Sequence, residues 1–224
     1  MKKYGYLVLT VLIAAGIYAW DLWYCGGLYR TGGLLSVQAV TAENFSRLFC
    51  QNLITVIPQL VILVGTVLFQ RRNFVEIFGF QIKERRGRIA VCLAGTGYLL
   101  LLASGLLWGK TAPLSVLYQW GYYLIFVALA EELIFRGLLP WLVQKSGLPE
   151  WCVWIIPGVL FGCMHTLIPV MEQGVSAHLL GILTSGVLGY LAYSCGAYAL
   201  RRWSGTLWLP VLLHAAFDFI TVFA

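Results

Sequence analysis

Six polar side chains that could carry out chemistry interrupt otherwise apolar stretches of this sequence. They are Glu131, Glu132, Arg136, His165, His214 and Asp218. A carboxylate and two imidazoles in a cavity shielded from water suit the activation of a water molecule, because they supply a base, a proton shuttle and a stabiliser of a developing oxyanion. The same residue types are the usual ligands of a catalytic zinc ion, so a metal site is the alternative interpretation. The sequence lacks an H-E-x-x-H motif, and this excludes a zincin.

Helical spacing assigns some of these side chains to pairs. Glu132 and Arg136 are four positions apart with the acid first, which is the favoured order for a helical ion pair. Glu131 is rotated by about 100° from its neighbour and can therefore face a cavity. His214 and Asp218 are also four positions apart and share one helix face. The aspartate could orient the imidazole or share a ligand with it.

The composition indicates which elements must position these groups. The chain has 224 residues, of which 60% are hydrophobic and 11% charged, and its mean hydropathy is +0.83. A soluble domain is nearer half apolar and a quarter charged, so we expect an all-α polytopic membrane protein. Seven apolar segments predict transmembrane helices, since backbone groups in lipid must be satisfied within each segment. These segments are roughly 4–20, 50–69, 89–108, 117–143, 151–170, 178–200 and 207–223.

The positive charges predict an orientation for these helices. Eleven of the 15 Lys and Arg residues lie on one side of the seven segments and three lie on the other. Because short cytoplasmic loops are enriched in Lys and Arg, we expect a multi-pass protein of the cytoplasmic membrane with a cytoplasmic N-terminus. The net charge of +6 then indicates membrane lipid as a partner and not nucleic acid. A secretory signal peptide is the alternative for the first segment, but no A-x-A site follows, so we expect an uncleaved span.

The depth of the polar groups predicts a single site. A charge at the centre of a spanning helix costs about 2.5–3.5 kcal/mol, which makes such residues functional candidates. Counted from the nearest charge on the expected inner side, Glu131, His165 and His214 all lie about 18–22 Å along their helices. The fourth, fifth and seventh helices therefore bring polar groups to one layer.

Two further patterns concern packing between helices. Gly158 and Gly162 form a G-x-x-x-G pair just before His165, and small residues at this spacing let helices approach closely. Cys25 and Cys50 fall on the same expected outer side and could form a disulfide, whereas the other four cysteines are typical apolar packing residues.

Three short motifs resemble those of the CPBP family, which comprises CAAX proteases and bacteriocin-processing enzymes and is also called the Abi family. EELIFRG (131–137) resembles its E-E-x-x-x-R motif, FGCMH (161–165) its F-x-x-x-H motif and HAAFD (214–218) its H-x-x-x-[N/D] motif. Each motif alone is weak, but three in the family's order on separate helices are specific. We expect one integral-membrane domain, 1–224, in which 116–224 carries the motif core and 1–115 adds further transmembrane helices.

The resemblance implies an all-helical intramembrane endopeptidase. By matching position, Glu131 would be the general base that activates water, and His165 would assist it. Glu132, Arg136 and Phe161 would support the structure of the site.

The remaining motif residues, His214 and Asp218, would stabilise the oxyanion or complete a metal site. If zinc or another divalent metal is present, the resemblance implies the ligands His165, His214, Glu131 and Asp218; an enzyme without a metal is the alternative. Eukaryotic prenyl-protein members of the family carry Asn where this chain has Asp218. An ionised aspartate cannot donate a hydrogen bond to an oxyanion, so orienting His214 or binding a metal suits it better.

The substrate implied by the resemblance is a hydrophobic or lipidated peptide that is cut near the cytoplasmic membrane face. The short chain favours a hydrophobic bacterial peptide precursor over a C-terminal CAAX substrate. A non-catalytic peptide-binding or bacteriocin-immunity protein of the same fold is the first alternative. A small transporter that uses Glu131, Glu132 and Asp218 as a proton relay is the second, although the sequence has no internal repeat.

Overall fold

The fold is known from a computed structural model that describes residues 3–167 and 177–223, with side chains described from residue 186 onward in the second range. All secondary structure in these ranges is helical, which confirms the expected all-α class. The α-helices are α1 (Lys3–Arg30), α2 (Phe45–Thr55), α3 (Ile57–Phe69), α4 (Phe74–Phe78), α5 (Arg85–Trp108), α6 (Pro113–Tyr122), α7 (Ala130–Glu132), α8 (Leu139–Lys145), α9 (Glu150–Met164), α11 (Ala177–Ser204) and α12 (Trp208–Phe219). Short 3-10 turns form η1 (Val37–Ala39), η2 (Arg71–Asn73) and η5 (Ile220–Phe223), and π-helical turns form η3 (Tyr123–Leu129) and η4 (Leu133–Leu138).

Two described helices, α1 and α5, are long and apolar enough to cross a membrane. The pair α2 and α3 would form a third crossing if its 50° bend lies within one span. The expected span 117–143 is helical throughout, because α6, η3, α7, η4 and α8 follow one another without a break. The last part of the expected span 151–170, from residue 168, lies outside the described residues. The count of seven transmembrane helices stays a prediction.

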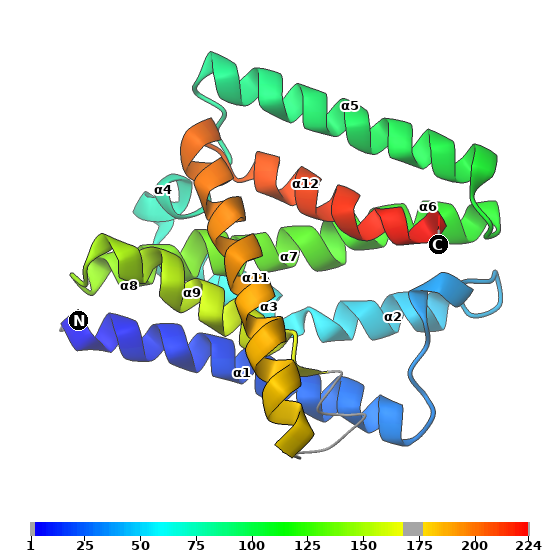
Figure 1. The fold of residues 1–224 in the computed structure, drawn as a ribbon, viewed down its shortest axis with the longest axis horizontal. Coiled ribbons are helices and arrows are strands. Elements are labelled where there is room, and N and C mark those ends of the chain that lie inside the picture. The colour runs from blue at the N-terminus through cyan, green and yellow to red at the C-terminus, as the bar shows by residue number, and fades with distance from the viewer. Residues whose placement is uncertain (1–2, 168–176, 224) are drawn as a thin grey trace.

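The helices are arranged around the long helical stretch from α6 to α8. Figure 1 shows α1, α5 and α12 running lengthwise through the molecule, while α11 crosses them steeply. α11 packs mainly on α9, and α12 packs on α5 and η3. The two ends of the chain lie at opposite ends of the molecule (Figure 1).

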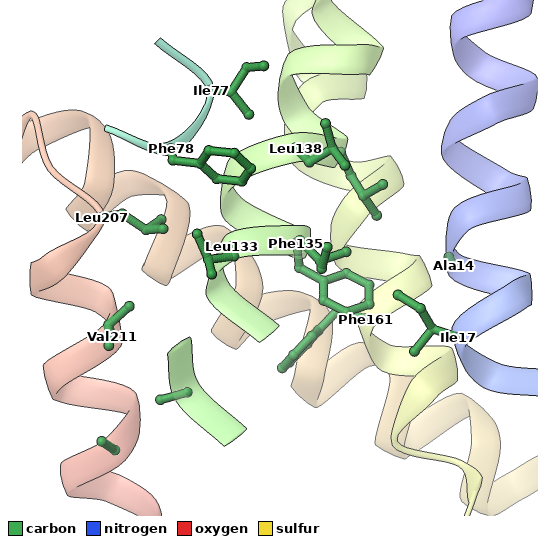
Figure 2. Packing of buried hydrophobic residues seen from close by; sticks show 14 of the residues in the cluster. Ala14, Ile17, Ile77, Phe78, Leu133, Phe135, Leu138, Phe161, Leu207 and Val211 are labelled. Atoms are coloured by element: carbon green, nitrogen blue, oxygen red, sulfur yellow. The ribbon is translucent and has the colours of Figure 1, made fainter. Parts of the chain in front are cut away.

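The apolar core surrounds the second half of this central stretch. Residues 132–143 are buried without a break, because they are apolar on nearly every side and have helices on all faces. Phe135 and Phe161 meet edge to face with ring centroids 5.2 Å apart, and Ile17 of α1 packs beside them (Figure 2). The polar groups of the central stretch are therefore held in a tightly packed environment.

Glycine lets α9 and α11 approach closely, as the G-x-x-x-G pair predicts. A Cβ atom at Gly162 would lie 3.0 Å from both the Cα atom and the carbonyl oxygen of Val187 in α11. This spacing is tighter than ordinary van der Waals contact, so only glycine fits there without a shift. The suggested disulfide is wrong: Cys25 and Cys50 are both unpaired, and the Cys25 Sγ lies 3.8 Å from the Thr55 Oγ1.

Candidate active site

The first motif lies where the central helix changes its winding. The three residues of α7 include Glu131 and Glu132, and π-helical turns precede and follow them in η3 and η4. π-Helical turns are rare and occur frequently at functional sites. A π turn holds more residues than an α turn, so it rotates the side chains after it away from their α-helical positions. No pattern in the sequence predicted these turns.

Glu132 joins the central helix to α12. Its Oε1 accepts a hydrogen bond from the Nδ1 of His214 at 2.9 Å and lies 3.1 Å from an Nη1 of Arg136. The Glu132 and Arg136 side chains are both 0% exposed, which confirms the predicted ion pair and shows that it is fully buried. The Arg136 guanidinium also lies over the rings of Phe161 at 4.0 Å and Tyr193 at 5.3 Å, contacts that stabilise a cation.

His214 presents its second nitrogen to two more carboxylates. Its Nε2 lies 3.4 Å from an Oδ2 of Asp218 and 3.8 Å from an Oε2 of Glu131. Since the Nδ1–H is donated to Glu132, Nε2 is the nitrogen that can exchange a proton with either acid. The predicted contact between His214 and Asp218 is present. The acid that orients the imidazole through Nδ1, however, is Glu132.

His165 lines the same cavity as His214 and Asp218. This cavity has a volume of about 270 Å³, and aromatic side chains form the rest of its wall: Phe161, Tyr190, Tyr193 and Phe217. The His165 Nδ1 lies 2.9 Å from the carbonyl oxygen of Phe161, and its ring stacks on that of Tyr190 with centroids 3.9 Å apart. Among the described residues no hydrogen bond or ion pair joins His165 to Glu131, so the expected assistance of His165 to Glu131 stays a prediction.

Two aromatic residues of α11 belong to this site although the sequence gave no reason to select them. Tyr190 stacks on His165, and Tyr193 lies 5.4 Å from His214 between ring centroids. A tyrosine within an apolar span is usually a packing residue, so the presence of Tyr190 and Tyr193 in the sequence does not by itself indicate a functional site. The helix α11 therefore also contributes side chains to the cavity, beside the three helices expected to form the site.

Comparison with known families agrees with the three motifs. The family model described as "Type II CAAX prenyl endopeptidase Rce1-like" matches residues 113–220, a segment that contains every motif residue. The matched segment is just under half of the chain, and it is similar to the CAAX protease family. Searches of curated proteins and of solved structures found no match to the chain. Together with the apolar helices, this similarity indicates a membrane-embedded protease.

A buried carboxylate lies in α1, outside the segment 113–220. Asp21 is 8% exposed, and its Oδ1 has no hydrogen-bond partner among the described residues. Sequence analysis missed it because the expected first span ended at residue 20, whereas α1 continues to Arg30. The one sequence feature that could have indicated Asp21 is its position as a single acid directly after the apolar segment 4–20.

The metal site that the resemblance to CAAX proteases implied stays a prediction. No group of three or more His, Cys, Asp and Glu side chains within residues 3–167 and 186–223 is spaced to hold a metal ion. The Nδ1 atoms of His214 and His165 face Glu132 and the Phe161 carbonyl, so their Nε2 atoms would be the ligands of a bound metal.

Proposed function

We propose that the protein is an intramembrane endopeptidase in which Glu131 activates water and His214 shuttles the proton. The observation that carries this proposal is the pair of distances at the His214 Nε2, 3.8 Å to Glu131 and 3.4 Å to Asp218. The similarity of residues 113–220 to the CAAX protease family supports it. A base and an imidazole this close can pass a proton between them after a small movement.

The first chemical step forms a bond between water and the carbonyl carbon of the substrate. Glu131 takes one proton from the water as its oxygen attacks, and the carbonyl oxygen becomes an oxyanion. His214, with its Nδ1–H held by Glu132, is oriented so that a protonated Nε2 can stabilise that oxyanion. His165 also lines the cavity and supplies a second donor to the oxyanion when its Nε2 carries the proton.

The second step breaks the bond between the carbonyl carbon and the amide nitrogen. As the oxyanion re-forms a carbonyl, His214 gives its Nε2 proton to the leaving amine and then takes the proton held by Glu131, so that one acid and one amine product result. Asp218 stabilises the imidazolium form of His214 during this transfer. The buried pair holds the Glu132 carboxylate beside Arg136 and so keeps the imidazole of His214 in one orientation.

The walls of the cavity favour an apolar substrate. Phe217 and Tyr190 line the cavity and remain exposed on the outside of the molecule. A hydrophobic or lipidated segment that reaches the cavity from the membrane would contact these rings and exclude water from the reacting groups. We place the cut near the cytoplasmic face of the cell membrane, with the N-terminus cytoplasmic, on the distribution of Lys and Arg.

The experiment compares peptide termini in cells that contain wild-type protein with those in cells that contain Glu131→Gln at equal membrane levels. Glu43→Gln is the matched control, because Glu43 is an exposed acid far along the chain from the motifs. We expect new termini near hydrophobic segments with the wild type and the control but not with Glu131→Gln. Identical termini from all three would contradict the proposal.

A non-catalytic protein that binds a peptide, such as a bacteriocin-immunity protein, is the second candidate. The same apolar cavity supports it, because it can hold a peptide without chemistry. This candidate predicts that Glu131→Gln still protects cells against a peptide toxin, and the endopeptidase predicts that it does not.

A further inference from the structure

A second and larger cavity lies away from the candidate active site, at the end of the molecule where α1 begins. Its volume is about 670 Å³. It lies between η2 and α4 on one side and the ends of α8 and α11 on the other. Trp141 lines this cavity and contacts Tyr6 of α1 edge to face, with ring centroids 6.4 Å apart, so the cavity lies near the start of α1.

The charge of this cavity is positive. Arg72, Lys83 and Arg201 line it, and none of the three forms an ion pair with a carboxylate among the described residues. The Arg201 guanidinium is fixed in place, because it donates hydrogen bonds to the carbonyl oxygens of Glu76 at 3.2 Å and Ile77 at 2.7 Å.

The other charged groups of the cavity already have partners. Arg202 is paired with Glu150. The Glu76 carboxylate accepts a hydrogen bond from the Trp141 Nε1 at 3.2 Å and lies 3.7 Å from the Lys145 Nζ. The cavity therefore presents three cations that no acid of the described residues neutralises.

We propose that this cavity binds a phosphate group. Arg and Lys side chains that converge on a hollow are the usual way in which proteins hold phosphate. The same end of the molecule carries most of the chain's Lys and Arg, which is the end expected at the cytoplasmic surface, where anionic lipid headgroups gather. The indole of Trp141 in the wall is typical of a membrane interface. These features favour the headgroup of an anionic lipid as the source of the phosphate over free inorganic phosphate.

The test uses the purified full-length protein in a non-ionic detergent and counts bound lipid by native mass spectrometry. The probes are phosphatidylglycerol, phosphatidylcholine and inorganic phosphate. The variant is Arg72→Gln with Lys83→Gln, which removes two cations of the cavity. The matched control is Arg71→Gln with Arg85→Gln, since these exposed cations are close in sequence but do not line the cavity. Both doubles lose the same net charge, and all four residues are exposed, so folding is retained.

We expect phosphatidylglycerol to bind the cavity variant about 30-fold more weakly than the wild type, since each cation near the surface contributes about 1 kcal/mol. The control should stay within about threefold of the wild type. If millimolar inorganic phosphate does not displace bound phosphatidylglycerol, the phosphate group in the cavity belongs to a lipid. If inorganic phosphate displaces the lipid, the cavity binds free phosphate. An equal loss in both doubles, or no loss in either, overturns the proposed site.

Discussion

The Oε1 of Glu132 accepts a hydrogen bond from the Nδ1 of His214 at 2.9 Å, although the two residues are 82 positions apart in the chain. The same oxygen lies 3.1 Å from the buried guanidinium of Arg136. One carboxylate thus fixes the imidazole of one helix and neutralises the cation of another. Because His214 faces Glu131 and Asp218 with its other nitrogen, this single contact sets the geometry of the proposed reaction.

Replacing Arg136 with Gln should destabilise the fold strongly. The variant leaves the Glu132 carboxylate buried without its cation, and breaking a buried pair in this way costs about 3–5 kcal/mol. The measurement is the free energy of unfolding in one detergent. Arg86→Gln is the control, because Arg86 and Glu84 form an exposed pair at 2.6 Å whose loss costs about 1 kcal/mol or less. Equal losses in the two variants would contradict the buried pair.

Replacing Gly162 with Val should separate α9 from α11. The added side chain has no room against Val187, and overpacking of this kind costs about 1–3 kcal/mol. It should also reduce activity, because His165 directly follows the end of α9 and its partner Tyr190 lies on α11. Gly189→Val is the control, since a Cβ at Gly189 meets nothing within 4 Å. If Gly162→Val unfolds at the wild-type temperature, the close approach is not present.

Sequence patterns predicted the fold class and the polar site because both depend on strong, local signals. Apolar length identifies helices in lipid, and the positions of Glu132 and Arg136, four apart, identify an ion pair. The family resemblance is confirmed for residues 113–220. These signals need no knowledge of how the helices pack.

The remaining features of the site depend on tertiary contacts that spacing along one helix cannot report. The hydrogen bond from His214 to Glu132 joins two helices, and the π-helical turns beside α7 arise from packing that the sequence does not display. The role of Tyr193 beside His214 follows from the steep crossing of α11. The number of spans and the roles of the motif residues stay predictions.

Replacing Asp21 with Asn should stabilise the protein. Asp21 is buried, and its Oδ1 has no hydrogen-bond partner among the described residues. The neutral amide removes a buried charge at nearly constant volume, which we expect to add about 1 kcal/mol to the free energy of unfolding. The measurement is thermal unfolding of the purified protein beside the wild type. A lower unfolding temperature would show that the Asp21 carboxylate is held by a favourable partner.

Removal of divalent metals should leave peptidase activity within about twofold of its starting value. The proposed steps use the side chains of Glu131, His165 and His214 and assign no role to a metal. The measurement is the cleavage rate after dialysis against a chelator, together with the zinc content of the purified protein. Loss of activity that returns on addition of zinc would contradict the proposed chemistry.

The most direct measurement is the rate at which purified Glu131→Gln, in lipid nanodiscs, cleaves the peptide whose new terminus depends on the wild-type protein. A positioned general base contributes about 10²–10⁴-fold, so we expect the rate to fall by at least that range while Glu43→Gln retains the wild-type rate. A Glu131→Gln protein that is folded and cleaves the peptide at the wild-type rate would contradict the proposal that Glu131 activates the water.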